Sequence, residues 1–169
     1  MNIFVLDLDP TKAALYHCDK HVVNMLRETA QMLSTTHRLM SSTDDSFPFI
    51  YKTTHVNHPC NIWLRESVEN YLWLLELYEE LEYQYNERYN RSHASYKLLY
   101  QYLRQVPDKL PVKGLTSFAQ ATPEQYKDPL DPVKAYRNYY LGDKLKFCRW
   151  TSPATTPYWV EEYLNNKPH

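Results

Sequence analysis

Glycine is almost missing from this chain, with only Gly114 and Gly142 among its 169 residues. Glycine supplies the unusual backbone angles of the loops that cradle phosphates in nucleotide-binding α/β folds. Two isolated glycines exclude a loop of that kind. We therefore do not expect a glycine-rich phosphate site.

Cysteine is also scarce, and the three that occur, Cys18, Cys60 and Cys148, lie far apart in the sequence. They are too few for a disulfide framework, and no two have the close spacing of a zinc knuckle. This usage predicts a reducing, cytoplasmic setting.

The chain has neither a long apolar run nor an excess of one charge. The apolar stretch 2–6 is interrupted by Asp7 and Asp9 and has no basic residue before it, so it predicts neither a signal peptide nor a membrane span. Nineteen basic residues face twenty acidic ones. Any contact with nucleic acid must therefore come from a local patch, and the most basic segment is 134–150.

Apolar side chains do recur at helical spacing along most of the chain. They predict helices at about 10–40, 61–89, 92–104 and 132–150, with a proline-rich connection at 106–131. Asp9-Pro10 and Asp131-Pro132 each have the form of an N-cap followed by a first-turn proline. We predict one compact all-α domain over 1–169, with three to four main helices, a short N-terminal extended arm and an aromatic C-terminal tail at about 151–169.

The first predicted helix carries a polar stripe and an apolar one. At 100° per residue, His17, His21 and Glu28 fall within roughly 40° of one another, and Asn24 and Gln31 lie beside them. A run of hydrogen-bonding groups is costly to bury without a purpose, so we expect the polar stripe to line a site. The apolar stripe, predicted to pack on the core, consists of Leu15, Val22, Leu26 and Leu33.

Two kinds of chemistry fit the polar stripe. His17 and His21 have the i, i+4 spacing that can bind one divalent metal, with a third ligand from Glu28, His55 or His58; this would make a metal-dependent phosphoesterase or nucleotide hydrolase. Alternatively, Glu28 acts as an acid–base group in a partly apolar groove, with Arg27 and His21 tuning its charge.

Two further segments are candidates for substrate contacts. His58, held extended by the following Pro59, belongs to a loop that either closes over the stripe or only caps the next helix. In the last predicted helix Lys134, Tyr136, Arg137 and Tyr140 interleave cations with rings. This composition suits a phosphate backbone and stacked bases, although a packed helix face would show the same tyrosines.

Several of these motifs occur together in a known group of proteins. The stretches HCDKHVV (17–23), ETAQ (28–31), NHP (57–59) and AYRNYY (135–140) are similar to those of a family of small proteins common in phage genomes. More distantly, the layout resembles the endonuclease V-type pyrimidine-dimer DNA glycosylases. The shared parts are the N-terminal arm, a helix with Arg27-Glu28, the 57–59 loop, a long helix ending in Arg88-Tyr89 and an aromatic, basic C-terminal segment.

The resemblance implies an activity and a site. In the glycosylases the N-terminal α-amine attacks the sugar C1′ of a damaged nucleotide and forms a Schiff base, assisted by a glutamate. It thus implies that the Met1 amine is the nucleophile and Glu28 the acid–base group, with His21 and Arg27 beside them and no cofactor. Asn2 is too bulky for efficient removal of the initiator methionine, so the amine would be that of Met1.

The implied partner is DNA or a nucleotide, in the cytoplasm of an infected host cell if the chain is phage-encoded. Substrate contacts are expected from the remaining stripe and loop residues and from the last helix: His17, Asn24, Gln31, His58, Lys134, Tyr136, Arg137 and Tyr140. A third interpretation is a non-catalytic module that binds a nucleotide or a host protein and uses these side chains only to line a pocket.

Overall fold

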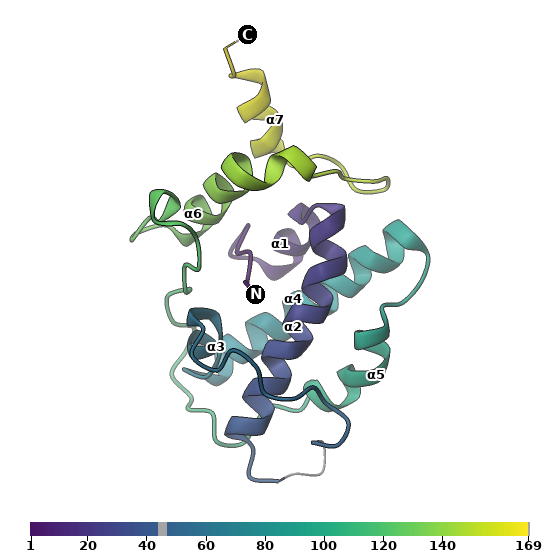
Figure 1. Cartoon of the computed structure of the whole chain (residues 1–169), viewed down its shortest axis with the longest axis vertical. Helices are drawn as coiled ribbons and strands as arrows, with labels where there is room; N and C mark the ends of the chain where they lie inside the picture. The colour runs from purple at the N-terminus through teal and green to yellow at the C-terminus, as the bar shows by residue number, and fades with distance from the viewer. Residues whose placement is uncertain (44–46, 169) are drawn as a thin grey trace.

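The computed structural model describes residues 1–43 and 47–168, and over these ranges the chain folds into seven α-helices with no strand. The prediction of an all-α domain is confirmed. Two helices of 22 residues, α2 (Asp19–Met40) and α4 (Val68–Tyr89), pack against each other at its centre (Figure 1). The shorter helices are α1 (Pro10–Tyr16), α3 (Pro59–Leu64), α5 (Ala94–Leu103), α6 (Pro132–Tyr139) and α7 (Tyr158–Asn165).

Aromatic side chains fill much of the core. Trp63, Tyr71 and Tyr78 are completely buried, as are Tyr136 and Tyr140 from the C-terminal part of the chain. Large rings bury much apolar area per residue, so a few of them can form much of a core. The fully buried tyrosines therefore serve packing.

The apolar stripe of α2 is in the core as predicted, with one exception. Val22, Leu26 and Leu33 are fully buried, whereas Leu15 is 40% exposed. Leu15 belongs to α1, which has a different direction from α2, so the helical phase counted across both segments does not apply to it.

The continuous helix predicted for 10–40 is wrong, because the chain breaks after Tyr16. His17 has extended backbone angles (φ −61°, ψ 130°) and α2 begins only at Asp19. Carbonyl oxygens that a continuous helix would pair with backbone N–H groups accept from the buried Arg88 instead: Nη1 lies 2.8 Å from His17 O and Nη2 lies 3.2 Å from Leu15 O. A tertiary contact thus replaces the helical bonds.

Other predicted boundaries also shift. The helix expected at 61–89 is divided at 65–67, because the Ser67 hydroxyl accepts from Asn70 N–H (3.1 Å) and starts α4 anew. The helix expected to reach Trp150 leaves α-geometry after Tyr139, passing through one π-turn and one 3₁₀ turn that ends at Phe147. The aromatic tail contains a helix of its own, α7.

The N-terminal arm forms neither helix nor strand, and it lies inside the molecule. Asn2 to Leu6 are all buried, and in Figure 1 the N-terminus is enclosed between α2 and α6. The Phe4 ring stacks on His21 of α2 (4.5 Å between ring centroids) and meets Tyr136 and Tyr140 edge-on. Within the described ranges, no helix is both long enough and apolar enough to traverse a lipid bilayer.

Candidate active site

The Met1 α-amine lies beside the carboxylate of Glu28. The distance from the amine nitrogen to Glu28 Oε2 is 3.5 Å. The Met1 side chain is only 5% exposed, and its sulfur lies 3.5 Å from Asn61 Nδ2. Glu28 remains 22% exposed, so the pair is partly open to solvent. A nucleophilic amine and a carboxylate that can accept its proton therefore lie together in a fixed place.

The arm is held in register along α2. Phe4 stacks on His21, seven residues before Glu28, so the arm runs in the opposite direction to α2. Seven helical residues cover about 10.5 Å and three extended residues about 10 Å, so the two lengths match. Met1 consequently reaches Glu28 when Phe4 is seated on His21.

Hydrogen bonds fix the residue next to the amine. Asn2 Nδ2 donates to Ala121 O (2.9 Å), and Asn2 Oδ1 accepts from Ile3 N–H (2.8 Å) and lies 3.0 Å from the Tyr136 hydroxyl. Tyr136 OH also accepts from Ala121 N–H (3.1 Å). The fully buried Tyr136 thus ties the arm to the proline-rich connection. We predicted that its ring would be open for base stacking, but the ring lies inside the core.

The loop that carries His58 lies next to Met1, because Asn61 contacts both. His58 caps α3, its Nδ1 accepting from Cys60 N–H (3.2 Å). Burial lowers the pKa of His58, and the charge of the Met1 amine lowers it further, whereas Glu28 acts in the opposite direction. His58 therefore shares one electrostatic environment with the amine and the carboxylate. It favours a neutral imidazole, which can accept a proton.

The loop leading to His58 is anchored on α2 and α3. Thr35 of α2 exchanges hydrogen bonds with the backbone of Thr54, and Asn61 Nδ2 donates to Thr54 O (3.2 Å) and His55 O (2.9 Å). His55 has a left-handed backbone (φ 47°), which is uncommon outside glycine and asparagine. The hydrogen bonds that Asn61 donates to these two carbonyls thus hold a locally strained turn in place beside the amine.

Asn61 is a site residue that the sequence analysis missed, since we expected only that a helix begins near it. It is completely buried inside α3, and it contacts both Met1 and the histidine loop. The available signal was an asparagine among the apolar residues of the stretch PCNIWL. A polar side chain in such a position must find partners, and here they are the N-terminal residue and its loop.

Asn24 and Gln31 flank Glu28 on α2, and both are partly exposed. Arg27 is exposed as well, and its charge lowers the pKa of His93 at the start of α5, although burial is the larger cause of that shift. Arg27 therefore acts toward α5. Among the described residues no contact joins Arg27 to Glu28, so the expected influence of Arg27 on Glu28 is not supported by a contact.

His17 and His21 occupy a separate, buried cluster around Phe4. His17 Nδ1–H donates to Ala13 O (2.6 Å), and its buried Nε2 has no hydrogen-bond partner in the described ranges. Burial lowers the pKa of His17 to about 3. His21 Nδ1 lies 2.5 Å from the hydroxyl of the buried Tyr140, which therefore belongs to the core and does not face a substrate.

The metal hypothesis lacks its ligand set. Within 1–43 and 47–168 no three His, Cys, Asp or Glu side chains come together in a way that could hold a metal ion. His17 and His21 lie against the Phe4 ring, and Glu28 lies about two helical turns along α2 from His21. A His17–His21 centre with Glu28, His55 or His58 as third ligand is thus not formed.

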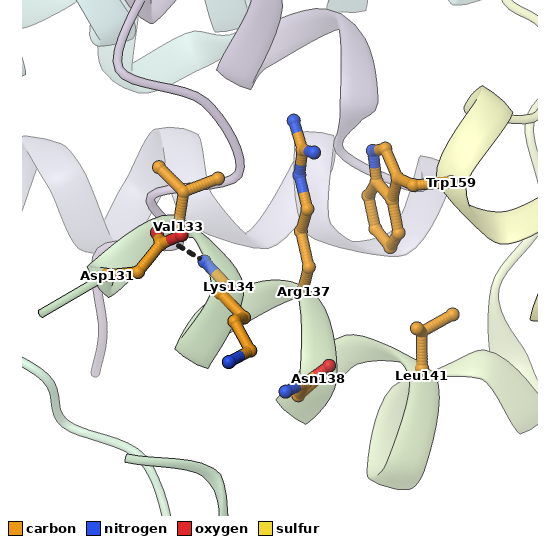
Figure 2. A pocket seen from close by; sticks show the side chains of 7 residues that line it. All are labelled: Asp131, Val133, Lys134, Arg137, Asn138, Leu141 and Trp159. Atoms are coloured by element: carbon orange, nitrogen blue, oxygen red, sulfur yellow. Dashed lines mark hydrogen bonds between the residues drawn. The ribbon is translucent and has the colours of Figure 1, made fainter. Parts of the chain in front are cut away.

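The predicted cations of α6 line a separate pocket. A cavity of about 250 Å³ lies between α6 and α7, with Lys134, Arg137, Asn138 and Trp159 in its wall (Figure 2). Arg137 is committed to the fold: Nε donates to Leu6 O (2.9 Å), and its guanidinium packs on the Trp159 ring (5.4 Å). Lys134 is exposed and pairs with Asp128 (3.0 Å).

Comparison of the chain with models of protein families, with curated proteins and with solved structures finds no match.

Proposed function

We propose that the chain is a DNA-acting enzyme that uses the Met1 α-amine as a nucleophile on the sugar C1′ of a damaged, modified or abasic nucleotide, with Glu28 as the acid–base group. The observation that carries the proposal is the 3.5 Å distance between the amine and Glu28 at a partly open position. The reaction class is N-glycosidic cleavage followed by β-lyase strand cleavage.

The first step forms a Schiff base. Glu28 takes a proton from the α-ammonium group, and the neutral amine attacks C1′. The C1′–N bond to the base breaks, and the base leaves with a proton; at an abasic site, water leaves instead. In an intact nucleotide the C1′–O4′ bond then opens as a proton passes from the attached nitrogen to O4′, and the ring-opened sugar is joined to Met1 through a protonated imine.

The second step is β-elimination. The imine acidifies the C2′ proton, a carboxylate or neutral imidazole removes it, and the bond from C3′ to the 3′-phosphate breaks. Glu28 and His58 are the two groups beside the amine that can carry protons in this step. Hydrolysis of the imine afterwards frees the amine.

The surroundings of Met1 support a positioned nucleophile. An α-amine at the end of a free chain would explore many orientations, whereas the arm, the buried Met1 side chain and the contact with Asn61 restrict it. Holding a reacting group in one geometry contributes substantially to rate.

The test is borohydride trapping. Duplex DNA with one abasic site, and duplexes with UV photoproducts or modified bases, are incubated with the protein and sodium borohydride. We expect a protein–DNA adduct that peptide mapping places on Met1. Glu28→Gln should lower the trapping rate by about 10²-fold or more, whereas the matched control Glu87→Gln, an exposed glutamate of α4, should keep the rate of the unaltered chain.

A chain carrying two extra residues before Met1 separates the amine from Glu28 while leaving Glu28 in place. It should lose the adduct although its thermal unfolding curve shows the fold intact. Trapping that persists in the extended chain, an adduct on a lysine, or no adduct with any of these substrates would refute the proposal.

A further inference from the structure

The segments that carry Cys18 and Cys148 lie side by side at the start of α2. They are joined by the backbone bond from Asp19 N–H to Arg149 O (2.8 Å). Thr151 adds bonds from its N–H (3.1 Å) and hydroxyl (2.6 Å) to the Asp19 carboxylate.

The environment distinguishes the two sulfurs. Cys18 is the N-cap residue of the 22-residue helix α2, where the unpaired N–H groups favour a thiolate. The hydrogen bond from Cys148, and one from His21, lower the pKa of Cys18. The same bond between the thiols, together with burial, raises the pKa of Cys148. The pair therefore holds one proton between its sulfurs, and Cys18 has the thiolate character.

Only Cys148 has a route to solvent. It lines a cavity of about 400 Å³ together with Arg149, Trp150 and Val160. Arg149 gives the entrance a positive charge, and the remaining wall is largely apolar. Cys18 is completely buried and does not line this cavity. This arrangement has an outer thiol that an incoming reagent can reach and an inner thiol that can only react with the outer one.

We propose that Cys18 and Cys148 are a reversible dithiol–disulfide pair that is oxidised by an anionic low-molecular-weight disulfide entering through this cavity. Cys148 passes its proton to Cys18 and attacks one sulfur of the reagent, whose other half leaves as a thiolate. Cys18 then attacks Cys148, forming the protein disulfide and expelling the second half. The single proton of the pair leaves with the small thiols, one of which departs as a thiol and the other as a thiolate, so the chain loses two electrons and the reagent gains them.

Cys60 provides the internal comparison. It is also completely buried, but its sulfur lies 3.7 Å from Asn2 Oδ1 at the N-terminal arm, and burial raises its pKa to about 11. We expect Cys60 to stay reduced while the pair reacts. Burial alone thus predicts equal protection of all three cysteines, whereas the proposed exchange predicts that only two react.

The experiment exposes the folded, full-length chain to oxidised glutathione, blocks the remaining thiols with an alkylating agent, and maps the peptides without reduction. We expect loss of two of the three thiols, a peptide cross-link between Cys18 and Cys148, alkylated Cys60, and full reversal by dithiothreitol. Cys60→Ser should give the same cross-link. Cys18→Ser should stop at a glutathione adduct on Cys148, and Cys148→Ser should slow the loss of the Cys18 thiol by at least about tenfold.

A stable glutathione adduct on the unaltered chain, oxidation of Cys60 at the rate of the pair, or retention of all three thiols would overturn the proposal. The mapping of the unaltered chain decides the matter even if a serine variant fails to fold, because its cross-link and its alkylated cysteine are both read directly.

Discussion

The burial of His17 predicts a marked loss of stability in mild acid. Its Nδ1 donates to Ala13 O, its Nε2 has no partner among the described residues, and the Phe4 ring covers it edge-on. Burial is the main reason why the pKa of His17 falls from 6.5 to about 3, and the neighbouring charges of His21 and Arg88 lower it further. A proton on His17 therefore has no acceptor in the folded chain.

The sign and size follow from linkage. The folded pKa lies below the unfolded one, so between pH 6.5 and pH 3 the unfolded chain binds a proton that the folded chain does not. The free energy of unfolding is unaffected by His17 well above pH 6.5 and falls by about 1.4 kcal/mol per pH unit within that window. Lowering the pH from 7 to 5 should cost about 2 kcal/mol through this residue alone.

Urea unfolding followed by tryptophan fluorescence measures this effect, since Trp63, Trp73 and Trp159 are buried. His17→Gln removes the titrating ring. Between pH 7 and pH 5 the free energy of unfolding of this variant should therefore fall by about 2 kcal/mol less than that of the unaltered chain. His55→Asn is the control, because the His55 side chain is exposed and asparagine accepts its left-handed backbone. Equal pH dependences for His17→Gln and the unaltered chain would refute the reasoning.

Three further outcomes can be measured by the same unfolding assay. Arg88→Met should destabilise the fold by about 3 kcal/mol or more, because the Asp19 carboxylate and the freed carbonyls of the α1 end lose their donor; a cost below 1 kcal/mol would contradict its role in the helix break. Tyr136→Phe should cost about 1–3 kcal/mol by leaving Asn2 and the Ala121 N–H without the hydroxyl, and it should slow borohydride trapping. Asn90, which ends α4 with φ 51°, should tolerate glycine but lose about 1 kcal/mol as alanine, and equal stabilities of the two variants would count against backbone strain there.

Local signals in the sequence predicted the all-α class and some of the helix starts. The N-cap and proline signals at Asp9 and Asp131 mark the true starts of α1 and α6. The same kind of signal was present at His58-Pro59 and Ser67 but was interpreted as a turn and a helix interior. Those two boundaries were recoverable from the sequence, because a first-turn proline and a serine N-cap act locally.

The break after Tyr16 could not be predicted in the same way. No glycine or proline marks it, and the helical periodicity continues across it. It depends on Arg88, which is distant in sequence and bonds the carbonyls at the end of α1. Tertiary contacts of this kind override local preference, and they leave no signal within the segment that they divide.

The arm explains why the polar stripe pointed to two different sets of residues. His21 carries Phe4 and His17 meets the edge of the same ring, so the histidines hold the arm, whereas Glu28 faces its first residue. Both sets are needed for one geometry, because the position of Phe4 on His21 determines where the amine falls along α2. Shifting the arm by one residue would move the amine by about 3.4 Å and place Phe4 on the opposite side of the arm. A stripe that looks like one cluster of ligands on a helical wheel therefore has one half that anchors the arm and another half that faces the N-terminal amine.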